Sequence, residues 1–79
     1  MELIEKRPYR HFKGNLYYVH NLVTHTEIGD ILVSYQALYP PYGMFVRPLS
    51  MFCEKIDPKR EGNKFGQLWR FLLYQGEGN

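Results

Sequence analysis

The residues of this sequence that could ligate a metal or transfer a proton are few and scattered. They comprise three histidines, one cysteine and a nearby glutamate: His11, His20, His25, Cys53 and Glu27. Zinc sites use paired His or Cys ligands at short fixed spacing, and the sequence has no such pair. His20 and His25 are an odd number of positions apart, so on a continuous strand they face opposite sides of a sheet. Only His25 with Glu27, joined by His11, leaves a metal hypothesis open; we expect hydrogen-bonded histidines and no metal or other cofactor.

Nucleophilic catalysis has no support in the sequence. Cys53 lies between Phe52 and Glu54 in a segment where apolar residues are expected, so we interpret it as a small buried hydrophobe rather than an activated thiolate. Ser34 and Ser50 have no neighbouring His or Asp. Three glycines stand alone in separate turns, Gly14, Gly29 and Gly43, which is not the pattern of a phosphate-binding loop. We therefore predict no catalytic residue.

The densest polar segment is Thr24-His25-Thr26-Glu27, in or beside a hairpin loop. Side chains of this kind commonly satisfy the backbone groups of a turn, and His25 then braces the loop. In the functional alternative, His25, Thr26 and Glu27 line one edge of a cleft. Cations and rings from other segments complete this candidate binding site: Arg10, His11, Tyr39, Tyr42 and Arg47. Aromatic rings beside arginines suit the stacking of bases or the capture of a charged peptide.

Positive charge is unevenly distributed along the chain, although the net charge is only +2. Every Lys and Arg lies outside the stretch from Gly14 to Val46. If the two ends of the chain meet in the fold, a basic face results. The alternative is scattered charge that serves solubility.

Such residues must be positioned by a very small domain. With 79 residues the chain forms one domain, 1–79, with a core from about residue 8 to 74 and a frayed end from Gln75 to Asn79. Aromatic residues make up 16% of the chain and favour strands. The single cysteine excludes an internal disulfide and favours the cytoplasm, and no apolar run is long enough to span a bilayer. We expect a monomer or a homodimer.

Turn residues recur at short intervals, as an all-β chain requires. The predicted strands are Tyr9 to Lys13, Leu16 to Thr24, Ile31 to Tyr39, Met44 to Arg47 and Leu68 to Leu73. Gly14-Asn15 suits a two-residue hairpin turn, and Pro40-Pro41-Tyr42-Gly43 suits a type I turn. Leu49 to Phe52 forms one helical turn that Ser50 can cap, and Phe52 to Ile56 extends again.

The predicted fold is mostly β, a small antiparallel SH3-like or OB-like barrel of about five strands with one short helical turn. An α+β roll is the competing fold. The last segment also fits helical spacing through Phe65, Leu68, Trp69 and Leu72, and we favour a strand because the segment is short, aromatic and bounded by glycines.

Several ordered blocks are similar to a known family. The blocks are Tyr9-Arg10-His11-Phe12-Lys13-Gly14-Asn15, Thr24-His25-Thr26-Glu27, Tyr35-Gln36-Ala37-Leu38-Tyr39 and Val46-Arg47-Pro48-Leu49 with Met51-Phe52. They resemble bacterial domain-of-unknown-function family 1653 over roughly Tyr9 to Lys55, with an echo at Arg70-Phe71. The function of that family is unassigned, so the resemblance implies a fold and a set of positions but no activity.

Small barrels offer grooves and loops more readily than enclosed catalytic cavities, so we predict a non-enzymatic binding module. Single-stranded nucleic acid or a peptide is the expected partner, and no membrane is involved. The alternative is a small hydrolase-like enzyme, or a small-molecule binder, that uses the region of His25 and Glu27.

Overall fold

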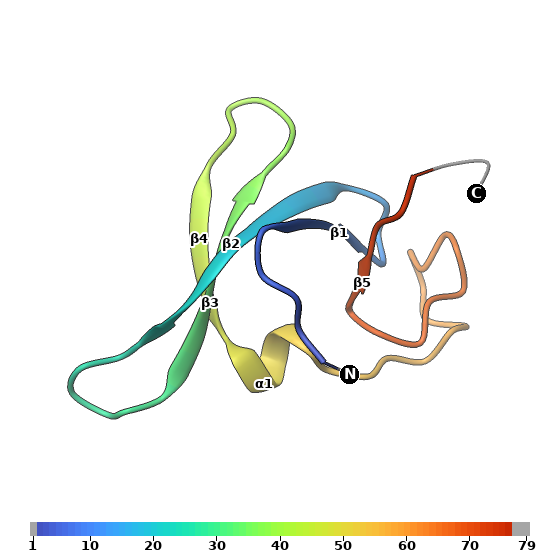
Figure 1. Cartoon of the computed structure of the whole chain (residues 1–79). Coiled ribbons are helices and arrows are strands. Elements are labelled where there is room, and N and C mark those ends of the chain that lie inside the picture. Colours follow the sequence, from blue (N-terminus) through green and yellow to red (C-terminus); the bar gives the residue numbers. More distant parts are fainter. Residues whose placement is uncertain (1, 77–79) are drawn as a thin grey trace.

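Five antiparallel strands form one sheet in the computed structural model, which describes residues 2–76 (Figure 1). The elements are β1 (Arg7–His11), β2 (Leu16–Thr24), β3 (Ile31–Ala37), β4 (Met44–Pro48), α1 (Leu49–Phe52) and β5 (Phe71–Leu73). Their order in the sheet is β4-β3-β2-β1-β5. The predicted mostly β fold with a short helical turn is confirmed. The sheet is not closed, since β4 and β5 remain its two edges, so the word barrel describes it only loosely.

The core lies on one face of this sheet. Alternate residues of β1, β2, β3 and β5 point to the same face, where the buried residues are largely aromatic. They pack with Phe52 of α1, whose ring stacks on Phe71 with a centroid distance of 4.0 Å. Burying each large apolar side chain contributes about 1.5–3 kcal/mol. The buried cluster consists of Tyr9, Val19, Val33, Tyr35, Phe52 and Phe71.

Two turns differ from the sequence-based prediction. The β1–β2 connection is not a two-residue hairpin, because the Gly14 N–H donates to the His11 carbonyl and the His11 N–H donates to that of Asn15. Gly14 stands at the fourth position of this turn with a φ of 110°, a conformation that glycine adopts without a Cβ clash. The turn between β3 and β4 starts one residue earlier than predicted, since the Tyr42 N–H donates to the carbonyl of Tyr39.

Several element boundaries also differ from the prediction. Ser50 does not cap α1, which follows Pro48 without a side-chain cap. Residues 53–70 form no strand, and only an isolated bridge joins Lys55 to Trp69. The last strand starts at Phe71 rather than Leu68 because the residues before it belong to a loop.

The strand β2 has the predicted bounds but is interrupted by a bulge. Its pairing with β3 shifts between Val19 and Asn21, so that His20 is an extra residue. An extra residue reverses the alternation of faces beyond it. The expectation that His20 and His25 face opposite sides holds only for a continuous strand, so it does not apply to β2, which also ends before His25.

The loop of residues 57–70 is tied to β1 by a buried glutamine. The side-chain oxygen of Gln67 accepts the Arg10 Nε–H at 2.8 Å, and its side-chain nitrogen donates to the carbonyls of Arg10 and Trp69. Asn63 closes the loop, because its side chain both accepts the Gln67 N–H and donates to the Gln67 carbonyl. A charged loop that the sequence left unplaced is thus held beside β1 and β5 (Figure 1).

Within residues 2–76, no helix is long and apolar enough to cross a membrane. The predicted fraying from Gln75 to Asn79 falls mainly on residues 77–79, which lie outside the described residues.

Candidate nucleic-acid interface

Phe12 is the centre of a group of cations, although it lies in the turn after β1. Its ring is fully buried. The guanidinium of Arg60 lies 4.9 Å from the ring centroid, that of Arg70 5.9 Å and the Lys13 ammonium 6.0 Å. These distances are within the range of cation–π attraction. The backbone fixes the arrangement, since the Phe12 N–H donates to the Arg70 carbonyl and the Phe12 carbonyl accepts the Lys64 N–H.

His11 lies beside Phe12 and faces the same cations. Its Nδ1 accepts the backbone N–H of Lys13 at 3.1 Å, so the ring proton of the neutral form is on Nε2. Burial and, after it, the charges of Arg70, Arg47, Lys13 and Arg60, in that order of effect, together lower the pKa of His11 to about 4. The ring is therefore neutral at pH 7 and donates from Nε2.

The hydroxyls of Tyr17, Tyr35 and Tyr39 add further polar groups to the region around His11. The hydroxyls of Tyr17 and Tyr39 share a hydrogen bond of 2.7 Å. Burial and this bond raise the pKa of Tyr17 to about 12, so its hydroxyl keeps its proton. The Tyr35 hydroxyl accepts the Arg47 Nε–H at 3.3 Å, and the Arg47 guanidinium lies 5.8 Å from the centroid of the Phe71 ring.

We call Lys13, Arg47, Arg60 and Arg70, which surround His11, the basic cluster. They come from the β1–β2 turn, β4, the 57–70 loop and the residue before β5. Within the described residues, the single ion pair joins Arg70 to Glu54 at 3.2 Å. The other three cations of the cluster therefore have no carboxylate partner among residues 2–76.

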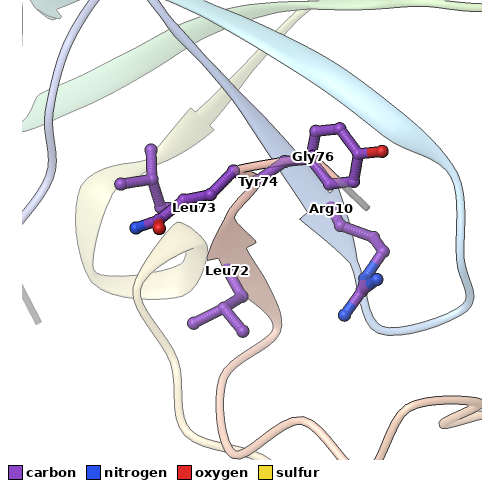
Figure 2. Close-up of a pocket in the computed structure, with 6 residues that line it drawn as sticks. Arg10, Leu72, Leu73, Tyr74 and Gly76 are labelled. Carbon is purple, nitrogen blue, oxygen red and sulfur yellow. The ribbon is translucent and has the colours of Figure 1, made fainter. Parts of the chain in front are cut away.

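Arg10 and Phe65 lie on the outer face of the sheet, because Arg10 alternates with the inward-facing Tyr9 and His11. The Arg10 guanidinium stacks 3.6 Å above the Phe65 ring, and the Phe65 side chain remains 55% exposed. Arg10 also lines a pocket of about 370 Å³ beside β5, with Leu72, Tyr74 and the chain up to Gly76 (Figure 2). Because the Arg10 guanidinium is already bound by Gln67 and Phe65, this pocket offers little free charge to a small ligand.

The polar segment of the β2–β3 hairpin lies elsewhere. His25 follows the far end of β2, roughly 30 Å from His11 for a strand of nine residues. Its Nδ1 accepts the backbone N–H groups of Glu27 at 3.2 Å and Ile28 at 3.4 Å, which braces the turn. His11 cannot join His25 and Glu27 at a metal. Among the described residues, no three His, Cys, Asp or Glu side chains are grouped to hold one.

The structure thus brings together some of the residues that the sequence proposed. His11, Tyr39 and Arg47 meet in one region, and Arg10 lies on the adjacent outer face. The segment from His25 to Glu27 lies at the opposite side of the molecule from the 57–70 loop (Figure 1). Tyr42 is exposed in the β3–β4 turn, where its carbonyl accepts the side-chain amide of Gln36.

Sequence reasoning missed several residues of this region: Tyr17, Tyr35, Phe65, Arg60 and Arg70 as site residues. The two tyrosines share the strand alternation of the core residues, which was a usable signal. The loop residues had none, because their positions depend on contacts with distant segments. Cys53 is partly buried, and burial raises the pKa of its thiol, the opposite of activation.

Comparison with known proteins gives a family without an assigned activity. The family model described as "Protein of unknown function (DUF1653)" matches residues 7–72. A crystal structure of a protein belonging to DUF1653 from Bordetella bronchiseptica is similar, with a TM-score of 0.72 and 31% identity over 92% of this chain and 88% of that chain. No curated protein matches the chain. The chain belongs to the DUF1653 family.

Proposed function

We propose that this domain is a module that binds single-stranded nucleic acid through the basic cluster, with Phe65 as a stacking platform. The observation that carries the proposal is the gathering of cations from four separate segments, three of them without a carboxylate partner among the described residues. A phosphate backbone supplies the regularly spaced negative charge that such a surface lacks.

The neutral groups of the region support the same ligand. His11 offers Nε2–H, the linked hydroxyls of Tyr17 and Tyr39 leave one O–H unused, and Arg47 binds the Tyr35 hydroxyl through Nε. A surface made of donors suits phosphate oxygens, which only accept. The exposed Phe65 ring, with Arg10 on one face, provides the flat surface on which bases stack.

Binding fits the geometry better than catalysis. An acid–base enzyme needs two positioned side chains directed at a substrate, whereas the Nδ1 of His25 is occupied by backbone amides of its own turn. The single cysteine, partly buried and unpaired, is consistent with the cytoplasm as the place of action.

The test measures, by fluorescence anisotropy, how salt affects binding to labelled single-stranded RNA and DNA of about 12 nucleotides. We expect the affinity to fall steeply between about 50 and 200 mM salt, with a log–log slope of about −0.7 for each phosphate neutralised. Arg60→Gln and Arg47→Gln should each weaken binding to all sequences alike and reduce the magnitude of that slope.

Lys6→Gln is the matched control, because it removes the same charge beyond the other end of β1. It should leave affinity and slope almost unchanged. No binding at low salt, or an equal loss in all three variants, would contradict the proposal.

A further inference from the structure

The strand β4 is an edge without the usual protection. It pairs with β3 on one side only. Three consecutive apolar residues are exposed on it: Met44 at 57%, Phe45 at 45% and Val46 at 62%. Natural proteins protect edge strands with lysines, prolines or bulges, because a free apolar edge pairs readily with another strand. In β4 the proline and the single cation come only at the end, as Arg47 and Pro48.

The free backbone groups of β4 belong to the residues with the most exposed side chains. The Ala37 N–H donates to the Gly43 carbonyl at 2.9 Å, so residues 37 and 43 form a hydrogen-bonded pair. Such pairs alternate along an antiparallel ladder, which makes Tyr35 and Phe45 the next one. The N–H and C=O groups of Met44 and Val46 therefore point away from β3.

We propose that β4 pairs with β4 of a second copy of this chain, antiparallel and centred on Phe45. In this register Met44 of each copy lies opposite Val46 of the other. Both residues direct their free backbone groups outward, so each of the two symmetric pairs exchanges two N–H···O bonds. The two Phe45 rings stand opposite each other in the closer, non-hydrogen-bonded position, where aromatic pairs pack well.

The absence of charge at the centre of β4 favours a second copy of this chain over a charged peptide as the pairing strand. The three central residues are uncharged, so the edge offers nothing for an acidic or basic strand to pair with. Arg47 is the only charge on β4, and in the proposed register it lies opposite Gly43 of the other copy. The two-fold arrangement therefore places no like charges opposite each other and matches apolar residues on both sides.

The pairing extends the sheet across the two copies and does not depend on the proposed function. A two-fold axis perpendicular to the sheet keeps the inner faces of both copies on the same side, so the two Arg47 residues also lie on one side. Pairing over so short a strand buries less than a standard interface of about 1,200–2,000 Å². The dimer is accordingly weak and depends on concentration.

The test is sedimentation equilibrium of the whole chain from about 10 to 500 µM, a range that spans weak association. We expect the mean mass to rise from that of the 9.5 kDa monomer towards twice that value. Val46→Lys should remain monomeric throughout, because a lysine in the middle of an edge strand opposes pairing with a second strand. Ile28→Lys, at the 65% exposed tip of the β2–β3 hairpin, is the matched control and should dimerise like the wild type.

Val46→Pro provides a second variant, since it removes a donor that β3 does not use. It should also abolish the rise in mass, while circular dichroism shows the same β content as the wild type. A wild type that stays monomeric, a Val46→Lys variant that still dimerises, or equal losses in both lysine variants would each overturn the proposal. A monomer that binds an added peptide at β4 would overturn it as well.

Discussion

In both the β1–β2 turn and the tip of the β2–β3 hairpin, a histidine Nδ1 accepts the backbone N–H of the residue two positions later. His11 accepts from Lys13 at 3.1 Å, and His25 accepts from Glu27 at 3.2 Å. The surroundings of the two rings differ. His11 is packed against aromatic rings and has four cations near it, three of them from distant segments, whereas the hydrogen bonds of the His25 ring lie within its own turn.

This difference shows that the local sequence determines the turn itself but not the residues that gather around it. The same short contact braces both turns, but the basic cluster exists only because Arg47, Arg60 and Arg70 reach the β1–β2 turn from elsewhere in the chain. A polar segment dense in hydrogen-bonding residues, as at the hairpin tip, is sufficient to build its own turn. Substitutions in the two regions should therefore have very different effects.

The largest expected difference is in the free energy of unfolding when an apolar side chain of each turn is removed. Phe12→Ala removes a fully buried ring under the cations and should lower the free energy of unfolding by about 3–5 kcal/mol. Ile28→Ala at the exposed hairpin tip should change it by about 0.5 kcal/mol or less. Urea unfolding followed by circular dichroism measures both. Similar losses would mean that the tip is packed as firmly as the turn.

The next effect separates two candidate stacking rings. Phe65→Ala should weaken binding of single-stranded oligonucleotides by about 1–3 kcal/mol, because it removes a stacking platform. The salt slope should remain, since no charge is lost. Tyr42→Ala removes the exposed ring that the sequence favoured and should change the affinity by less than about twofold. A larger loss with Tyr42→Ala would place the ligand over the β3–β4 turn instead.

The free energy of unfolding should depend on pH through His11. The pKa of His11 is lowered in the folded state, so the unfolded chain binds more protons between pH 6.5 and about 4. The stability due to neutral His11 is thus complete above pH 6.5 and decreases as the pH falls through that range. The ring is partly exposed, so the loss per pKa unit stays below the limit of about 1.4 kcal/mol.

Thermal unfolding at a series of pH values measures this loss. His11→Asn should flatten the dependence between pH 6.5 and 4, because it removes the ring whose pKa is lowered on folding. An identical pH profile for wild type and His11→Asn would contradict the enclosed, neutral state of this ring.

The smallest effect is expected for the exposed carboxylate of the hairpin tip. Glu27→Gln should change the free energy of unfolding by about 0.5 kcal/mol or less, because the side chain is exposed and the bonds to His25 use the Glu27 backbone. Oligonucleotide affinity should also be unaffected. If the variant instead loses a ligand that the wild type retains, such as a metabolite found by thermal-shift screening, the hairpin is a binding site in its own right.

The sequence predicted the strands better than the connections. The content of Tyr and Val and the turn residues on either side placed β2 at Leu16–Thr24 without error, because these residue types favour strands. The bulge at His20 was not predictable, since an extra residue leaves the composition of a strand unchanged. The same extra residue reversed the faces assigned beyond it.

The candidate site was predicted where its residues lie on strands or, like Tyr39, directly after one. His11 and Arg47 follow the inward alternation of β1 and β4, as do the core residues beside them. Arg60 and Phe65 belong to a loop whose course is decided by hydrogen bonds to β1, more than fifty positions away in the sequence. Local propensity carries no information on such bonds, so the charged loop could be recognised but not placed.

The buried amide of Gln67 has a consequence for recognition as well as for the fold. Because it joins the backbone and the guanidinium of Arg10 to the carbonyl of Trp69, the loop cannot open without breaking contacts of the sheet. Arg60 and Phe65 are therefore carried by a backbone that is already ordered before any ligand arrives. Under the proposed function, less conformational entropy would be lost on binding, which is the advantage of preorganisation.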